Sequence, residues 1–133
     1  MIPRFRAWDK EFKEMVQVDA LVFDEQVIKA TYKNGNVVKE DLKNYVLMQS
    51  TGLKDKNGKE IFEGDILTTG ERTGVVKNHR TLGFYVNDAR GDNWWFGGDV
   101  DLADFEDFTR DVAEKIEILG NIHENPELAE VRS

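Results

Sequence analysis

The residues with the clearest capacity for chemistry in this chain are two histidines, two serines and 26 acidic residues. His79 and His123 lie in unrelated contexts, and neither belongs to an HExxH array. Ser50 lies in MQSTG, which is no nucleophile elbow. Cysteine is absent, so a structural zinc site lacks its usual ligands. Chance pairs are expected among so many carboxylates. We therefore expect no enzyme activity, no metal site and no cofactor.

The aromatic run GDNWWFGG at 91–98 has the most promise for binding. Adjacent residues of a strand face opposite sides, so Trp94 and Trp95 cannot both enter one core. One of the two is expected to be buried, and the other then has two interpretations. In the first, it packs against the N-terminal hairpins, on Trp8 or Tyr32. In the second, it forms an exposed aromatic platform for a peptide, a base or a partner protein.

Charge limits the classes of partner. The net charge is −8, and residues 99–117 hold eight acids against two basic residues. This balance argues against sequence-independent DNA binding, which needs cations on phosphates. We therefore expect a protein as the partner. Two alternatives stay open: nucleic-acid binding by a local patch of Lys77, His79 and Arg80 beside an aromatic residue, and mimicry of DNA by the acidic stretch. Self-association is also open.

Length and hydropathy indicate one cytoplasmic domain. A chain of 133 residues can bury an independent core. The segment MIPRFRAWDK has charges without an apolar stretch behind them, so we do not expect a secretory signal. The longest apolar runs, at 20–23 and 45–48, are too short to span a bilayer. The sequence thus predicts no membrane association.

The first sixty residues predict β-hairpins. Residues 9–14 supply a polar turn before an apolar segment that begins at Met15. Asn34-Gly35 is typical of a type I′ turn, because this turn requires positive φ at both central residues. Residues 56–59, KNGK, predict a second tight reversal.

The remainder predicts a mainly β fold of short strands. They are expected at 65–68, 74–77, 83–87, 93–96 and 116–120, a spacing typical of a small SH3-like barrel or a pair of packed sheets. Apolar residues at near-helical spacing predict one short capping helix within 102–112. A short C-terminal helix is expected from Asn125 as cap, Pro126 as first residue and Glu127 in the first turn.

Three blocks carry a family resemblance: FRAWDKEFKEMV at 5–16, LMQSTGLKDKNGKEIFEGDIL at 47–67 and IEILGNIHENPEL at 116–128. They resemble the YopX family, small phage and prophage proteins of uncharacterised function. The resemblance implies a predominantly β fold and a phage or prophage origin, and it brings no catalytic residues. With that origin, the expected protein partner is a host or phage protein. It also implies a single domain over 1–133, which we divide into an N-terminal hairpin region (1–47), a barrel-like region (48–123) and a C-terminal tail (124–133).

The second block contains Glu63-Gly64-Asp65, which has a structural and a chemical interpretation. As a turn, Gly64 takes a backbone conformation that other residues avoid, and Asp65 binds neighbouring amides. The rival is a metal or catalytic role for Glu63 and Asp65. We favour the turn, and we place any specificity private to this chain within 68–115, where it departs most from the family.

Overall fold

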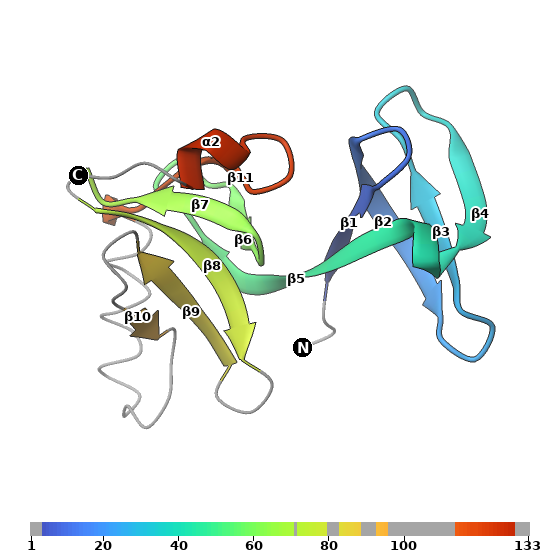
Figure 1. The fold of residues 1–133 in the computed structure, drawn as a ribbon, viewed down its shortest axis with the longest axis horizontal. Helices are drawn as coiled ribbons and strands as arrows, with labels where there is room; N and C mark the ends of the chain where they lie inside the picture. The colour runs from blue at the N-terminus through green and yellow to red at the C-terminus, as the bar shows by residue number, and fades with distance from the viewer. Residues whose placement is uncertain (1–3, 71, 80–82, 89–92, 96–113, 130–133) are drawn as a thin grey trace. The chain divides into compact units, whose positions relative to one another are not determined.

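The structure, a computed structural model, describes residues 4–70, 72–79, 83–88, 93–95 and 114–129. Within these residues the fold is mainly β, as predicted, and the strands form two antiparallel sheets (Figure 1). The six-stranded sheet has the order β4-β3-β2-β1-β5-β6, and the five-stranded sheet has the order β10-β9-β8-β7-β11. No barrel closes in the described part of the chain, so of the two predicted architectures the packed sheets are correct and the SH3-like barrel is wrong.

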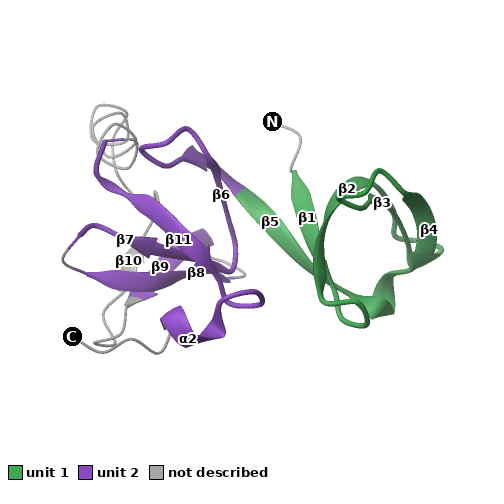
Figure 2. Cartoon of the chain, turned by 90° about the horizontal axis from the view of Figure 1, so that it is seen from above, with its two compact units in different colours: residues 1–50 green, residues 51–133 purple. Residues whose placement is uncertain are grey.

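The chain divides into two compact units, residues 1–50 and residues 51–133 (Figure 2). The division lies three residues beyond the predicted end of the N-terminal hairpin region, and the prediction of a single domain remains a prediction. Unit 1 contains β1 (Phe5–Asp9), β2 (Glu14–Val22), β3 (Val27–Thr31), β4 (Val37–Asp41), the 3-10 helix η1 (Leu42–Asn44) and the first half of β5 (Tyr45–Lys54).

Unit 1 consists of hairpins, as the sequence predicts, but one turn differs in type. The β3–β4 hairpin is closed by a bond from the Tyr32 amide to the Asn36 carbonyl (2.8 Å) and by one from the Gly35 amide to the Tyr32 carbonyl (2.9 Å). Gly35 has φ 91°, whereas Asn34 is not among the residues with positive φ. A type I′ turn is therefore wrong. The connection is a three-residue loop with glycine in the left-handed region.

The core of unit 1 follows strand alternation. Its buried members are Ala7, Val16, Ile28, Ala30 and Tyr45. Ala7 lies opposite both Val16 and Leu47, so these side chains form one row across β2, β1 and β5. Each strand thus places every second residue on the core-facing side.

Unit 2 begins with the second half of β5 and contains β6 (Glu60–Phe62), β7 (Asp65–Thr68), β8 (Thr73–His79), β9 (Gly83–Asp88), β10 (Asn93–Trp95), β11 (Glu117–Asn121) and the helix α2 (Pro126–Ala129). All five strands predicted after residue 64 are present, with ends within two residues of those expected. The buried core combines both sheets: Ile61 of β6 packs with Leu67, Val76 and Val86 of the second sheet and with Ile116.

The C-terminal helix forms with Pro126 first and Glu127 in its first turn, as predicted. Asn125 does not cap it by its side chain. The Asn125 Oδ1 instead accepts from the Asn121 amide at 3.3 Å, back in the preceding turn. The predicted capping helix at 102–112 lies outside the described residues. No helix in the described ranges has the length and apolar character needed to cross a bilayer.

Candidate binding site

The predicted binding residues lie on the second sheet of unit 2. Lys77 and His79 are both exposed on β8, two residues apart and therefore on one face of the strand. Tyr85 of β9 lies opposite Lys77 and so shares that face. Arg80 lies outside the described residues. The structure thus brings Lys77, His79 and an aromatic residue together, as the patch requires.

The backbone of Trp94 and Trp95 forms β10 together with Asn93. In the register, Trp94 lies opposite Val86 and Trp95 lies opposite Tyr85. The side chains of both tryptophans lie outside what the structure describes. That one of the two is buried and the other faces outward therefore stays a prediction.

A second group of polar residues lies in unit 1, on the core-facing side of its sheet. Asp9 lies directly opposite Glu14 on one side and Tyr45 on the other, so the three form one row across β2, β1 and β5. This row follows that of Val16, Ala7 and Leu47 on the same face. Two carboxylates side by side on a core-facing row are unfavourable for folding, since like charges directly opposite each other repel.

Four polar side chains of unit 1 form a hydrogen-bonded chain, in the order Asp9, Tyr32, Tyr45 and Glu40. The Tyr32 hydroxyl donates to Asp9 Oδ2, and the Tyr45 hydroxyl donates to Glu40 Oε2 at 2.8 Å. The two hydroxyl oxygens lie 2.8 Å apart. Asp9 is only 2% exposed, and its Oδ1 also accepts from the amides of Glu11 and Phe12 in the β1–β2 turn. One buried carboxylate thus fixes both the turn and the tyrosine chain.

Burial and the hydrogen bonds among these four side chains shift the pKa values of Tyr32, Tyr45 and Asp9. Burial raises the pKa of Tyr32 to about 12, and the hydrogen bond to Asp9 acts in the same direction. Burial, with the bonds to Tyr32 and Glu40, raises the pKa of Tyr45 far above its usual range. Burial also acts to raise the pKa of Asp9, but the Tyr32 hydroxyl and the two turn amides outweigh it, so this pKa is lowered. At neutral pH both tyrosines are therefore neutral and Asp9 is charged.

A pocket of about 430 Å³ lies next to the chain, and its lining comes from the β1–β2 turn, the β3–β4 turn and the strands beside them. Its lining residues are Phe12, Glu14, Tyr32, Asn34, Asn36, Val38 and Glu40. Phe12 is 69% exposed, although it is a large apolar residue. The pocket therefore combines aromatic surface, two carboxylates and two amides, within the size range of ligand sites in proteins.

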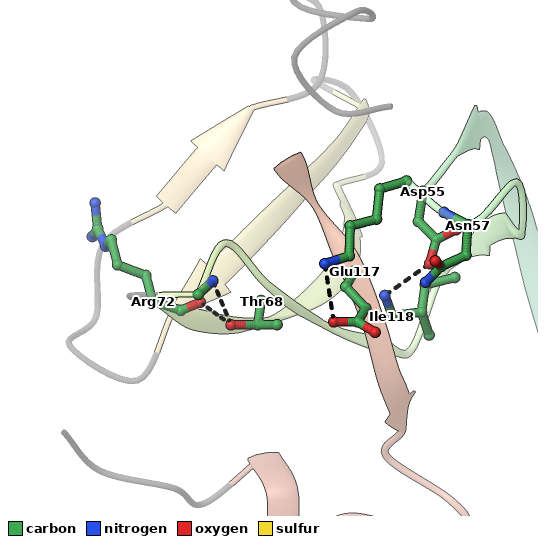
Figure 3. Close-up of polar contacts among 8 residues, drawn as sticks. Asp55, Asn57, Thr68, Arg72, Glu117 and Ile118 are labelled. Carbon is green, nitrogen blue, oxygen red and sulfur yellow. Dashed lines mark hydrogen bonds and ion pairs between the residues drawn. The ribbon is translucent and has the colours of Figure 1, made fainter. Parts of the chain in front are cut away.

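Unit 2 uses its buried polar residues differently. Asp55 is 2% exposed; its Oδ1 accepts from the amides of Asn57 and Lys59 within the turn, and its Oδ2 accepts from the Ile118 amide of β11 at 3.0 Å (Figure 3). Burial acts to raise the pKa of Asp55, but these backbone bonds lower it below its usual value. Lys56 adds an ion pair to Glu117 at 3.5 Å, which joins the turn to β11 a second time.

The Glu63-Gly64-Asp65 segment has the predicted turn geometry. Gly64 has φ 89°, and Asp65 Oδ2 accepts from the Phe62 amide at 2.7 Å. The Gly64 amide donates to the Val76 carbonyl, and its carbonyl accepts from the Ile122 amide. In the described ranges no group of three or more histidine, aspartate or glutamate side chains has the arrangement of a metal site.

Comparison with known proteins identifies the family. The family model described as YopX protein matches residues 4–130. The chain belongs to the YopX family. A solved structure, titled "Crystal structure of protein EF1440 from Enterococcus faecalis", is 30% identical over 98% of this chain and 99% of that chain, with a TM-score of 0.60. A search among curated proteins found no match.

The family match covers the three blocks of resemblance, but it does not point to the pocket. From the sequence, residues 9–14 are predicted only as a turn, and Tyr32 is predicted only as a packing partner. A signal was present nonetheless. Asp9 alternates in phase with Ala7, Glu14 with Val16 and Glu40 with Val38, so each acid occupies a core-facing position at a strand end. Acids in phase with core residues are the pattern that would have found this site.

Proposed function

We propose that this YopX-family protein is a non-enzymatic accessory protein of a phage or prophage, and that it acts in the bacterial cytoplasm by binding a protein. One observation carries the proposal: the pocket of unit 1 combines the exposed aromatic ring of Phe12 with two carboxylates. Aromatic residues beside fixed polar groups are typical of protein contact sites.

The buried acids of unit 2 support the non-enzymatic part of the proposal. Asp55 and Asp65 direct their carboxylates to backbone amides of neighbouring turns and strands. A catalytic acid or base needs a free position within reach of a substrate. These two carboxylates serve the fold instead.

The test uses the full chain as bait in crosslinking and capture from a bacterial host lysate, followed by binding of the purified captured protein by calorimetry. Two variants form a matched pair, Phe12→Ser at the pocket and Phe23→Ser in the β2–β3 turn, where Phe23 is 60% exposed. Phe12→Ser should lose the partner, and Phe23→Ser should retain it. Equal binding by Phe12→Ser and the unmodified chain would contradict the pocket as the contact site.

The predicted tryptophan contact is tested in the same experiment. Alanine at Trp94 and at Trp95, made separately, should separate a structural tryptophan from a contact one. The contact variant should lose the partner with little change in melting temperature. Unchanged capture by both variants would remove β10 from the proposed contact surface.

Nucleic-acid binding is the second candidate, because Lys77 and His79 share a face with Tyr85. A titration against single- and double-stranded oligonucleotides at several salt concentrations tests it, since phosphate contacts give a steep loss of affinity with salt. Lys77→Ala should reduce that slope by about one. The net charge of −8 opposes this candidate, and no binding at low salt would end it.

A further inference from the structure

The pocket of unit 1 has negative charge that the described residues do not neutralise. The ion pairs of lysines in the described ranges involve other acids: Glu25 with Lys39, Asp41 with Lys43 and Glu117 with Lys56. From the described residues, Glu14 receives a long bond of 3.4 Å from the Lys33 backbone amide, and Glu40 receives the Tyr45 hydroxyl. Together with Asp9, three carboxylates therefore lie on one face of the sheet, and no lysine or arginine in the described part of the chain forms an ion pair with them.

The tyrosine chain also lacks a hydrogen. Each phenol hydroxyl carries a single proton. The Tyr32 proton goes to Asp9 and the Tyr45 proton goes to Glu40, which leaves none for the 2.8 Å contact between the two hydroxyl oxygens. Three oxygen contacts share two protons. With both carboxyl groups ionised, the two ends of the chain therefore keep their negative charge, and a cation beside Glu40 would be attracted to that end.

The remaining lining indicates what kind of cation fits. Phe12, Tyr32 and Val38 present aromatic and aliphatic surface to the pocket. A divalent metal ion prefers a shell of oxygens and gains little from such surface. An organic cation with an apolar stem gains from both parts, since aromatic faces attract cations and the stem buries apolar area.

We propose that this pocket binds a lysine or arginine side chain from a basic segment of the partner protein. The stem lies along Phe12, Tyr32 and Val38, and the charged end lies between Glu14 and Glu40, where it donates hydrogen bonds to the two carboxylates. This inference rests on the proposed function, because it names the chemistry of the partner at the same site. Charge complementarity selects the occupant: an acidic pocket on a protein of net charge −8 favours a basic segment.

The binding test uses the full chain, labelled with ¹⁵N, and peptides of alternating glycine and lysine or glycine and arginine. A peptide of alternating glycine and glutamine is the neutral control. Amide shifts should change at Phe12, Asn34 and Asn36 with both basic peptides and stay unchanged with the neutral one. Spermidine and Ca²⁺ are added separately, and a tighter response to either than to the peptides would replace the protein side chain by a free polyamine or a metal ion as the occupant.

Charge-neutralising variants locate the site. Glu14→Gln and Glu40→Gln should each weaken binding of the basic peptides about tenfold, the effect of losing one charge-assisted contact. Asp24→Asn is the matched control, because it removes the same charge from the β2–β3 turn at the opposite end of β2. It should change affinity less than about twofold. Equal weakening by all three variants would reduce the effect to nonspecific attraction and overturn the proposal, as would the absence of peptide binding.

The two proposals fail in different ways. Capture of a partner that Phe12→Ser abolishes, but that Glu14→Gln and Glu40→Gln leave intact, would overturn the cationic side chain and keep protein binding. Pocket-specific peptide binding by a chain that captures no protein would overturn the proposed function and keep the cation site. Melting curves of every variant show whether the fold is intact. Glu14→Gln removes a repulsion rather than a contact, so we expect it to stay folded. A loss of peptide binding by this variant would therefore not be caused by unfolding.

Discussion

The two units of this protein bury acidic residues for opposite purposes. In unit 2, Asp55 and Asp65 accept hydrogen bonds from backbone amides, and Asp55 joins a turn to the distant strand β11. In unit 1, Asp9 binds its own turn but also begins a chain of side chains that ends at Glu40 beside the pocket. Backbone amides satisfy the acceptor oxygens of Asp55 within the fold, whereas the carboxylates that line the pocket stay accessible. The comparison separates acids that hold the fold from acids available for binding.

The largest expected effect comes from Asp55→Ala. It leaves the buried amides of Asn57, Lys59 and Ile118 without their acceptor, so it should reduce the free energy of unfolding by about 3 kcal/mol. Denaturant unfolding measures the loss. Asp55→Asn retains one acceptor oxygen and should lose about half as much. A loss below about 1 kcal/mol for the alanine variant would remove the structural role assigned to unit 2 acids.

Gly120→Ala tests the packing of the same unit and should cost about 2 kcal/mol, because overpacked sites destabilise by this order. A Cβ at Gly120 would lie 2.3 Å from Asn125 Oδ1 and 3.1 Å from Asn125 Cβ, so the side chain cannot simply rotate its end away. Thermal unfolding gives the measurement. Leu119→Ala, at a neighbouring residue that is 43% exposed, is the control and should cost clearly less. Equal melting temperatures for Gly120→Ala and the unmodified chain would show that the segment adjusts freely.

These positions also show what the sequence could and could not supply. Strand positions follow from alternation and turn residues, which act locally, so β7 to β11 were predictable within two residues. The turn type and the hydrogen-bond partners of short polar side chains were not predictable. Asn34-Gly35 was assigned the wrong turn and Asn125 the wrong hydrogen bond, because both depend on which neighbouring group a short polar side chain meets. The hydrogen-bonded chain needs Asp9 of β1, Glu40 of β4, Tyr45 of β5 and Tyr32 directly after β3, and only the register brings them together.

Tyr32→Phe tests the polar chain of unit 1 and should cost about 1 kcal/mol at neutral pH, the value of one hydrogen bond to a partly buried group. The folded pKa of Asp9 is lowered, so its contribution to stability is present above the unfolded pKa and is lost as the pH falls through the folded one. Without the Tyr32 hydroxyl the folded pKa rises toward the unfolded one, so the loss of stability on acidification should become smaller and end at higher pH.

Unfolding free energies measured from neutral pH down to about pH 2 give both effects. Tyr45→Phe is the control, because it removes a hydroxyl of the same chain but leaves the donor to Asp9 in place. Its acid transition should keep the original midpoint. If the acid transition shifts as much in Tyr45→Phe as in Tyr32→Phe, the four groups titrate as one unit. That result would contradict the conclusion that, of the two tyrosine hydroxyls, only that of Tyr32 lowers the pKa of Asp9.

Glu14→Gln has the smallest effect on stability and the opposite sign. Glu14 lies directly opposite Asp9, and removing one of two like charges in a cross-strand pair should stabilise the fold by about 0.5 kcal/mol. The same substitution in unit 2 acids that bind amides would destabilise it. Chemical unfolding of Glu14→Gln, with Asp24→Asn as the charge-matched control, makes the comparison. A more stable protein that binds basic peptides less well would show that unit 1 keeps this acid at a cost to folding, as a binding residue does. A less stable Glu14→Gln protein would place Glu14 with the structural acids of unit 2.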